Sequence, residues 1–583
     1  MRYTININLI EQVIFAIKLL TILSISYLTS CAIPSFAQDT SLPIEIVKNC
    51  KSKNLKDNKS NEETNSLLDN TYILPKAFPG LKVGEITFKR LDIFDTSNPN
   101  EDIALFRLAN KLHLATKKDV IRAQLLFAPG ELYSPQILLE SERLLRNTSY
   151  LYDARITAIV NCDNTVDVNV ITKELWTLVP EINFSRSGGE NKSKIGFRDS
   201  NLFGLGKRIS ISKTSNADRD GYLFIYDDPN ILNSRYRSHI EYSDNSDGEH
   251  YYFDINYPFF ALNTPYSYGL ATYSNTRTEQ IYNRGKVISE FSQNTQINNL
   301  HFGLSSRDQT WIKRVSFGYQ IEKHKFSELI NSTIPIAEDR NLNYPWFSMR
   351  WLQDKYIKIN NFDSISRTED LNLGWDFSAK IGYSDKNLSD DDNRLIYQTS
   401  INKAHFQSKD ILWRFNAGFY GYWNFKHAEM ENTLLNSSAQ VHYNTNLSQS
   451  WYAKLKVQYS KNLTSDNQLT LGGDTGLRGY PIHYQNGEQS VLFNLEKRYY
   501  WEYNFLQLFS VGGAVFFDIG RAWYANQDNG INGSTLKDVG IGLRLAPSKA
   551  NSKTVIHIDL AIPLDKSEDV ESAQWLLTVK NTF

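Results

Sequence analysis

From about Glu181 to its C-terminus, the chain consists of short segments in which apolar and polar residues alternate. Clusters of Asn, Asp, Ser and Gly separate these segments from one another. A period of two is typical of a β-strand with one apolar and one polar face. Clear examples lie at residues 209–212, 251–257, 315–319, 413–419 and 451–457. The second part of the chain is therefore predicted to be built from many antiparallel strands.

The composition indicates that these strands cross a membrane. The sequence contains 33 Tyr, 31 Phe and 11 Trp, but only 3 Met and 3 Cys. Beyond its signal-like N-terminus it has no apolar run of about 18 residues, so it could cross a membrane only as a closed barrel. The aromatic girdles at the two interfaces of such a barrel would use the surplus of aromatic residues. A soluble β-sandwich or propeller shows the same alternation and is the alternative.

The C-terminus favours the barrel. The last residues alternate, with apolar side chains at Trp575, Leu577, Val579 and Phe583. This ending resembles the signal by which bacterial outer-membrane barrels are recognised for assembly. It implies outer-membrane lipid as a partner, and the barrel-assembly machinery as a partner during biogenesis. We therefore expect an all-β transmembrane barrel over residues 178–583.

Residues 1–37 are predicted to form an export signal. The apolar run at residues 19–28 is too short to cross a bilayer as a helix. It is followed by Ser35-Phe36-Ala37, which offers small residues to a signal peptidase. The alternative is the lipobox-like Leu28-Thr29-Ser30-Cys31, which would lipidate Cys31.

Two cysteines remain if Cys31 leaves with the signal. In an oxidising periplasm, Cys50 and Cys162 would form a disulfide, and two free thiols are the alternative. Residues 38–75 are rich in Asn, Lys, Asp, Ser and Glu and contain little to bury. We expect them to form a flexible linker.

Residues 76–177 are predicted to form a small α+β domain. The sequence indicates a strand, two helices and two strands, at residues 83–88, 120–127, 135–145, 154–160 and 166–170. Thr116-Lys117-Lys118-Asp119 resembles a capping sequence for the first helix, and Ser134-Pro135 begins the second. This order, with residues 130–133 and 165–168, resembles a POTRA domain. POTRA domains hand client chains to a barrel, often by adding a client strand to a sheet edge. A small plug or spacer domain is the alternative.

The most specific residues lie at 471–480, with the sequence Leu-Gly-Gly-Asp-Thr-Gly-Leu-Arg-Gly-Tyr. The glycines allow a tightly folded loop, and the guanidinium of Arg478 is a planar fork of donors that suits a buried carboxylate. Downstream, Glu496 and Asp518 lie among apolar residues on predicted strands. Each would need a cationic partner in the barrel lumen, because an unpaired buried charge is costly.

These residues resemble the signature of the BamA superfamily, which includes TamA and the two-partner secretion transporters. The resemblance implies that the tip formed by Arg478, Gly479 and Tyr480 folds into the lumen and locks there. Arg478 would pair with Asp518, and Glu496 would be the second acceptor. An exposed loop arginine is the alternative. Residues 201–207, at an early turn of the barrel, also resemble the family.

The resemblance further implies about sixteen strands, five of them after the loop. Five alternating runs do follow residue 487, at 488–498, 509–524, 536–546, 552–562 and 573–583. More than eleven precede it, so we expect some of these to be hairpins in loops or one strand counted twice. The first and last strands, near 181–187 and 573–583, are expected to meet at a weak seam.

In function, the resemblance implies an outer-membrane pore that inserts proteins into the membrane or translocates them across it. Its partner would be a client polypeptide of unknown identity, and its N-terminal domain would lie in the periplasm. BamA carries five POTRA domains, TamA three and the secretion transporters two with a plug helix, whereas this chain has room for one. We therefore do not expect the central assembly factor.

Two other classes of function are alternatives. One is a barrel with a structural or lipid-handling role and no protein client. The other is an enzyme, which we do not expect, because the 10 His residues show neither metal-ligand spacing nor a nucleophile elbow. No metal or cofactor is predicted, and a formal net charge of -1 gives no reason to expect nucleic acid.

Overall fold

The computed structural model describes residues 74–583, except 330, 331, 333, 361–367, 447, 507, 526–532, 549–554, 566 and 581–583. The chain divides into two compact units, Met1–Cys50 and Lys51–Phe583, and all described residues belong to the second. The predicted signal peptide, Cys31, Cys50 and the predicted linker up to residue 73 lie outside the described residues. Among the helices that the structure describes, none has the length and apolar character needed to cross a membrane.

The small domain consists of a three-stranded sheet and three helices. The elements in chain order are β1 (Lys82–Leu91), α2 (Ala104–Leu112), α3 (Lys118–Gln124), α4 (Pro135–Arg146), β2 (Leu151–Val160) and β3 (Thr165–Glu174). β3 is the central strand, parallel to β1 and antiparallel to β2. Alternate residues of β2 and β3 form the core with Leu138 and Leu145 of α4, as the sequence pattern predicts.

Two details of this domain differ from the prediction. The helix α2 precedes the two predicted helices, so the order is β-α-α-α-β-β. No side chain caps α2 at Ile103, so the sequence lacks the signal that usually marks a helix start. Thr116 does not cap α3. The N-cap residue is Lys117, and the Thr116 hydroxyl donates to the Glu174 carboxylate at 2.8 Å.

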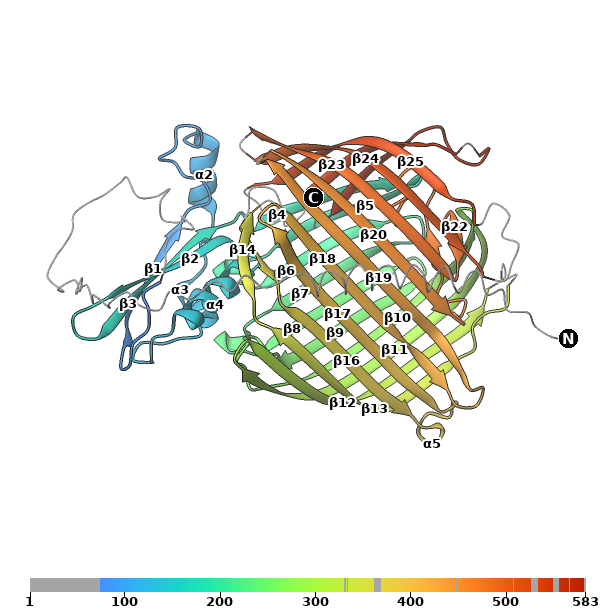
Figure 1. Ribbon diagram of the computed structural model, residues 1–583, viewed down its shortest axis with the longest axis horizontal. Coiled ribbons are helices and arrows are strands. Elements are labelled where there is room, and N and C mark those ends of the chain that lie inside the picture. The colour runs from blue at the N-terminus through green and yellow to red at the C-terminus, as the bar shows by residue number, and fades with distance from the viewer. Residues whose placement is uncertain are drawn as a thin grey trace. The chain divides into compact units, whose positions relative to one another are not determined.

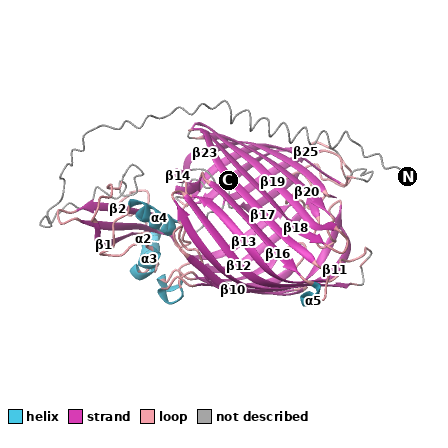
Figure 2. Cartoon of the chain, turned by 60° about the horizontal axis from the view of Figure 1, so that its bottom comes forward, coloured by secondary structure: helices cyan, strands magenta, loops and turns pink. Residues whose placement is uncertain are grey.

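Twenty antiparallel strands close into one barrel, shown in Figure 1 and Figure 2. The barrel strands are β4 (Leu178–Ser187), β5 (Glu190–Asp199), β6 (Arg208–Ser215), β7 (Asp220–Asp228), β8 (Arg237–Asn245), β9 (Gly248–Tyr257), β10 (Tyr266–Asn283), β11 (Lys286–Asp308), β12 (Trp311–Glu328), β13 (Arg340–Gln353), β16 (Trp375–Ser384), β17 (Arg394–Ser408), β18 (Ile411–Asn424), β19 (Glu429–Asn446), β20 (Gln449–Lys461), β23 (Gln489–Phe505), β24 (Phe509–Trp523), β25 (Leu536–Pro547), β26 (Val555–Pro563) and β27 (Gln574–Lys580). Short elements in the connections are η1 (Leu202–Gly204), η2 (Ile231–Asn233), β14 (Tyr356–Asn360), β15 (Thr368–Asn372), α5 (Lys386–Ser389), β21 (Leu469–Leu471) and β22 (Gln485–Gly487). We call the end of the barrel at which β4 begins the domain end, and the opposite end, which carries residues 462–488, the loop end.

The expected number of about sixteen strands is wrong. The five strands after residue 487 form as predicted, as β23 to β27. Before that residue the barrel has ten strands from β4 to β13 and five from β16 to β20. The extra alternating runs are therefore wall strands. Six of the fifteen strands before residue 487, β4 to β9, are only 8 to 10 residues long, so more strands fit into this part of the chain than the family resemblance implied.

The barrel strands turn apolar side chains outward and polar side chains inward, as alternation requires. On β12, Phe317 and Tyr319 are exposed on the outer face, whereas Arg314 and Glu322 are buried on the inner face. Large exposed apolar residues occur on most strands around the wall. The outer surface of the barrel is therefore apolar and the lumen is polar.

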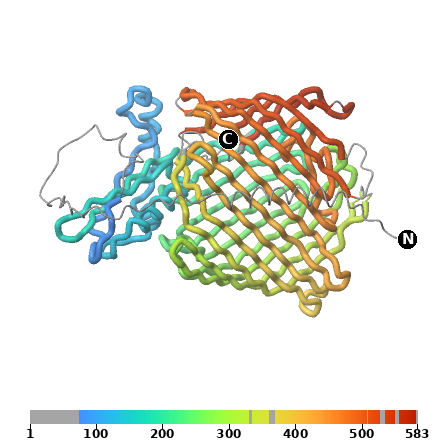
Figure 3. Tube along the Cα trace, viewed as in Figure 1, coloured from blue at the N-terminus to red at the C-terminus, as the bar shows by residue number. Residues whose placement is uncertain are grey.

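β27 closes the barrel against β4 through a short seam. Within the described residues, these two strands share one register pair, Leu577↔Arg186. By contrast, β26 and β27 pair from Val555↔Lys580 to Ala561↔Gln574, and β4 pairs with β5 along its full length. Figure 3 follows the chain around the barrel by its colour. Trp575, Leu577 and Val579 alternate along β27, and Phe583 lies outside the described residues.

Candidate functional site in the barrel lumen

The predicted motif lies in a folded loop, residues 462–488, which connects β20 to β23. Its two short strands, β21 and β22, pair with each other in antiparallel fashion. Its apolar side chains share a core with the barrel wall, made up of Leu469, Leu471, Leu477, Tyr480, Tyr484, Leu492, Ala522 and Leu536. The loop is thus anchored by burial as well as by polar contacts.

Two glycines give the tip of the loop its shape. Gly476 has a φ of +125°, which is left-handed and unfavourable for other residues. Gly479 lies so close to β25 that an added Cβ would be 2.8 Å from the Cβ of Asp538. Its backbone N–H donates to the Asp538 carboxylate at 3.0 Å. Glycine at these positions lets the loop approach the inner wall closely enough to place Arg478.

The structure brings Arg478, Glu496 and Asp518 together. The Nε and Nη2 atoms of Arg478 donate to the two oxygens of Asp518 at 2.7 and 2.8 Å, and Nη1 donates to Glu496 at 2.8 Å. The guanidinium also lies 3.4 Å from the ring centroid of Phe516. Arg478 is 4% exposed and Asp518 is fully buried. Bidentate pairing in a buried site is the strong form of this ion pair.

The carboxylates keep Arg478 charged. Burial by itself lowers the pKa of the guanidinium, but the carboxylates of Asp518 and Glu496 raise the pKa of Arg478 well above its ordinary value. Deprotonation of the arginine therefore does not weaken these ion pairs.

Besides Asp538, four further members of this cluster were not predicted from the sequence. Asn494 donates to Asp518 at 2.7 Å, and Asp559 lies 3.6 Å from Arg478. Arg498 donates to Glu496 at 2.9 Å, and Arg544 donates to Asp559 at 2.5 Å. A polar residue at an inward position of an otherwise apolar strand was the available signal, as at Asp559 within β26.

Beyond the tip, the loop contacts the connections of several strands at the loop end. Asp466 forms a buried ion pair with Arg340 of β13, at 2.6 Å. The backbone N–H of Ile482 donates to the carbonyl of Gly188, in the turn between β4 and β5, at 3.3 Å. Tyr484 donates to Asp569, in the connection between β26 and β27, at 3.2 Å. The loop therefore contacts the connections on both sides of the seam.

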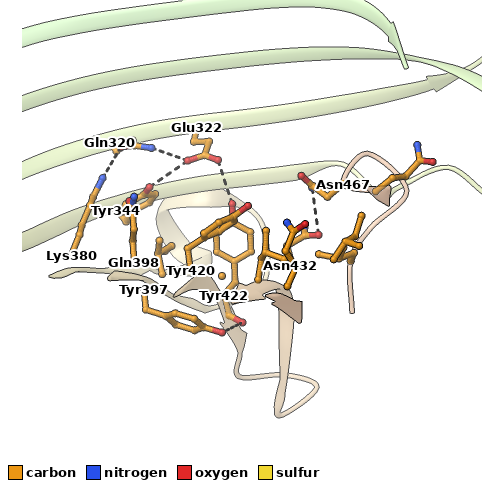
Figure 4. A pocket seen from close by; sticks show the side chains of 17 residues that line it. Gln320, Glu322, Tyr344, Lys380, Tyr397, Gln398, Tyr420, Tyr422, Asn432 and Asn467 are labelled. Carbon is orange, nitrogen blue, oxygen red and sulfur yellow. Dashed lines mark hydrogen bonds between the residues drawn. The ribbon is translucent and has the colours of Figure 1, made fainter. Parts of the chain in front are cut away.

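A polar cavity of about 400 Å³ lies under the start of this loop. Figure 4 shows Glu322 on one side of the cavity, facing Gln320, Tyr344 and Tyr422. The Glu322 carboxylate accepts hydrogen bonds from these three side chains and contacts a ring nitrogen of His324, at 2.8 to 3.5 Å. Asn467, Gln468 and Leu469 of the loop form part of its lining. Removal of the loop would open this cavity toward the loop end.

The other predicted site residues lie elsewhere. Residues 201–207 contact the small domain: Asn201 donates to the Thr116 hydroxyl at 2.9 Å, and the Gly204 carbonyl accepts from the Lys117 N–H at 2.9 Å. Cys162 is disulfide-bonded, while Cys50 lies outside the described residues, so their pairing stays a prediction. Within the described part of the chain, no group of His, Cys, Asp or Glu is arranged to hold a metal ion.

Two family models match the chain. Residues 379–545 match the model described as haemolysin secretion/activation protein ShlB/FhaC/HecB. Residues 111–174 match the POTRA model, described as surface antigen variable number repeat. Together they confirm the resemblance to the BamA and two-partner secretion superfamily. A search of curated proteins found no match.

Solved structures with a similar fold include BamA from Haemophilus ducreyi lacking POTRA domains 1-3, at 13% identity and a TM-score of 0.39. That match covers 85% of this chain and 84% of the other. CdiB from Escherichia coli is 11% identical with a TM-score of 0.43, and covers 85% of this chain and 76% of its own. CdiB from Acinetobacter baumannii is 11% identical with a TM-score of 0.40, and the match covers 85% of this chain and 73% of the other. Identities and TM-scores this low do not establish a common function, so the resemblance to the superfamily rests on the two family models.

Proposed function

We propose that this chain is an outer-membrane pore of the BamA and two-partner secretion superfamily that moves a client polypeptide out of the periplasm. The barrel would span the outer membrane, with the domain end and the POTRA domain in the periplasm. The observation that carries the proposal is the loop at 462–488, folded against the inner wall with Arg478 in a buried carboxylate cluster. A loop held in this way can close a polar lumen and can also be displaced from it.

In the closed state, Arg478, Gly479 and Tyr480 act as a lock on Glu496, Asp518 and Asp538. A client chain that enters the lumen would compete with the loop for the polar inner wall. Displacement of the loop would break the buried ion pairs, and this is unfavourable. The pore therefore stays closed when no client is present. The client's own folding outside the cell would drive its movement, since the proposal requires no nucleotide.

The POTRA domain is suited to receive an extended client. Its sheet has the order β1-β3-β2, so β1 and β2 lie at its two edges, and residues 130–133 already bond the start of β1. A client strand could add beside the rest of β1 through main-chain hydrogen bonds, with little demand on its sequence. This step does not depend on catalysis, in line with a family model that names secretion and activation.

The seam offers a second route, insertion into the membrane. A client strand could pair with β4 or β27, which share a single described register pair. We favour translocation through the lumen because the matched family is described as a secretion protein and the lumen holds the loop. A barrel with a structural or lipid-handling role would need neither a displaceable loop nor a POTRA domain.

The test is the conductance of the refolded protein in a planar bilayer. We expect the wild type to conduct weakly and Arg478→Ala to open to a larger and more frequent conductance. Arg350→Ala is the matched control, because Arg350 makes a similar bidentate pair with Asp376 within the wall, away from the loop. Equal conductance of all three proteins would contradict the lock.

A cross-link separates the two client routes. Arg186→Cys with Leu577→Cys would join the seam, and Phe302→Cys with Phe317→Cys would join β11 and β12 on the far wall. We expect both oxidised proteins to support the appearance of secreted client in a deletion strain. Loss of client only with the cross-linked seam would assign the insertion route. A normal secreted and outer-membrane proteome in the deletion strain itself would contradict a protein client.

Two further features are proposed on the sequence alone. Trp575, Leu577, Val579 and Phe583 would act as the assembly signal. A disulfide between Cys50 and Cys162 would tie the N-terminal segment to the POTRA domain, and cleavage after Ala37 would remove the export signal.

A further inference from the structure

The helix α2, which the sequence analysis did not predict, leaves a row of leucines uncovered. Leu105, Leu108 and Leu112 are 64%, 51% and 64% exposed. They follow one another at spacings of three and four residues, so they lie on the same side of the helix. Leu114, just after the helix, is 61% exposed. A contiguous apolar surface of this kind is unfavourable in water and marks a binding surface.

The helix is held firmly with this row outward. Phe106 stacks on Phe94 at 4.0 Å between ring centroids and is buried against Ile93 and Trp176. The Asn110 side-chain amide bonds both the carbonyl and the N–H of Phe94, at 2.8 and 3.1 Å. The exposed leucines are therefore a fixed feature of the domain and not the result of a loosely attached helix.

The leucine row faces an apolar cavity of about 360 Å³. Its other side is formed by Leu508, Phe509 and Pro547, at the domain end of β23, β24 and β25. On the same part of the barrel, Tyr503 and Phe505 of β23 are 63% and 46% exposed. The apolar surface of α2 is thus continuous with the apolar outer surface of the barrel at its domain end.

We propose that α2 is an interfacial helix whose leucines insert into the periplasmic leaflet of the outer membrane. The inference rests on the proposed location of the barrel. The polar side of the helix carries Lys111 and Arg107, both exposed, and Arg107 pairs with Asp102 at 2.5 Å. The ammonium of Lys111 suits the anionic headgroups of phospholipids. Continuity with the lipid-facing wall favours acyl chains over a client segment, because a client handed to the lumen would leave this outer surface uncovered.

This contact would fix the POTRA domain relative to the membrane. An interfacial helix buries its apolar face about 5–10 Å into the boundary between headgroups and acyl chains. The POTRA match begins at residue 111, so most of α2 precedes the matched module. In a chain with one POTRA domain, a membrane contact of its own would orient the edge strands toward the periplasm.

The test uses the full chain in phospholipid nanodiscs, with an environment-sensitive fluorophore at Leu108→Cys. Lys111→Cys, on the polar side of α2, is the matched control, and Ile541→Cys on the exposed face of β25 reports the barrel in lipid. Labelled wild type gives the background from the native cysteines. We expect strong quenching at 108 by lipids with a nitroxide near the headgroup, and strong quenching at 111 by aqueous iodide.

The three probes keep the two proposals distinct. Lipid quenching at 541 with none at 108 would overturn the interfacial helix and leave the membrane barrel intact. Absence of lipid quenching at both sites would contradict the barrel location itself. Protection of 108 from iodide that appears only at high protein concentration, without lipid quenching, would assign the surface to a second copy of the chain. Heat-modifiable migration checks that each variant is folded.

Discussion

The two sides of this barrel are held together in different ways. On the wall formed by β11 and β12, the register is continuous from Phe291↔Glu328 to Asp308↔Trp311. At the seam, β27 and β4 share one register pair among the described residues. There the loop at 462–488 contributes contacts that the wall does not need. It bonds Gly188 on the β4 side and Asp569 on the β27 side.

From this difference we propose that the barrel opens at the seam. Continuous backbone pairing is cooperative, so the wall can separate only by losing many hydrogen bonds together. At the seam, the loop contributes the hydrogen bond from Ile482 to Gly188 and the hydrogen bond from Tyr484 to Asp569. Under the proposed function a client would replace these contacts, so release of the loop should affect both the lumen and the seam, whereas changes in the wall should affect neither.

The largest effect is expected from Arg478→Ala. Removal of the guanidinium leaves Asp518 and Glu496 without their main cationic partner, which should cost about 3–5 kcal/mol for a buried pair. The temperature at which the folded protein loses its heat-modifiable migration should fall, and protease should cleave within residues 462–488. Arg350→Ala should cost at most about 1 kcal/mol, because its pair with Asp376 is solvent-exposed.

Equal behaviour of Arg478→Ala and Arg350→Ala would contradict the proposed difference between the loop and the wall. Equal falls in the unfolding temperature would mean that any arginine pair inside the barrel contributes similarly. Arg478→Lys sharpens the result, since an ammonium cannot make the bidentate pair with Asp518 and should restore only part of the stability. An unchanged protease pattern in Arg478→Ala would show that the apolar core of the loop holds it without the ion pairs.

Much of this site could be predicted from the sequence because the signals are local. Period-two alternation marks strands wherever they lie, and it gave the five C-terminal strands and the outward face of β27. The glycine-bracketed arginine and the carboxylates on apolar strands drew attention to Arg478, Glu496 and Asp518, but their pairing was implied by the family resemblance. The strand number failed for a different reason. The alternating runs before residue 487, the short strands β4 to β9 included, form fifteen wall strands, whereas the family resemblance implied about eleven there.

The remaining features have no local signal. The contact between Gly188 and Ile482 joins residues far apart in the sequence, and neither residue type indicates the other. Asp538 and Asp559 are ordinary strand residues until the closed barrel brings them beside Arg478. The helix α2 has leucines at helical spacing but no capping residue. Such features depend on closure of the barrel or on a partner surface.

An intermediate effect is expected at the seam turn, from Gly188→Ala. Both Gly188 and Gly189 have positive φ, +55° and +87°, so alanine is strained at either position. At Gly188 the added Cβ would also lie 2.2 Å from the backbone nitrogen of Ile482, whereas at Gly189 it meets nothing within 4 Å. We expect Gly188→Ala to be less stable than Gly189→Ala by about 1–3 kcal/mol, the usual cost of overpacking.

The two glycine variants are compared by protease cleavage of residues 462–488 and by the conductance of the barrel. Gly188→Ala should increase both, and Gly189→Ala should change them little. If both variants loosen the loop equally, strain in the turn and not contact with the loop determines the stability of the seam.

The smallest effect is expected from acid, through Asp569. Burial would raise the pKa of this carboxyl, but the hydroxyl of Ser567 and the guanidinium of Arg284 lower it from 3.8 to about 2. A depressed pKa stabilises the folded state above the ordinary value, and this stabilisation is lost as the pH falls through about 2. Because Arg284 and Asp569 are partly exposed, the contribution should stay below about 1 kcal/mol.

Asp569→Asn isolates this contribution from the other carboxylates. At neutral pH the variant should show more frequent channel opening than the wild type, because Arg284 and Tyr484 lose a charged acceptor. The difference between the two proteins should shrink as the pH falls through about 2, where the wild-type carboxyl becomes protonated. Asp308→Asn, an exposed carboxylate at the end of β11, should leave channel opening unchanged at every pH. A difference between Asp569→Asn and wild type that persisted unchanged at low pH would remove Asp569 from the contacts that close the seam, and would leave that role to the buried cluster around Arg478.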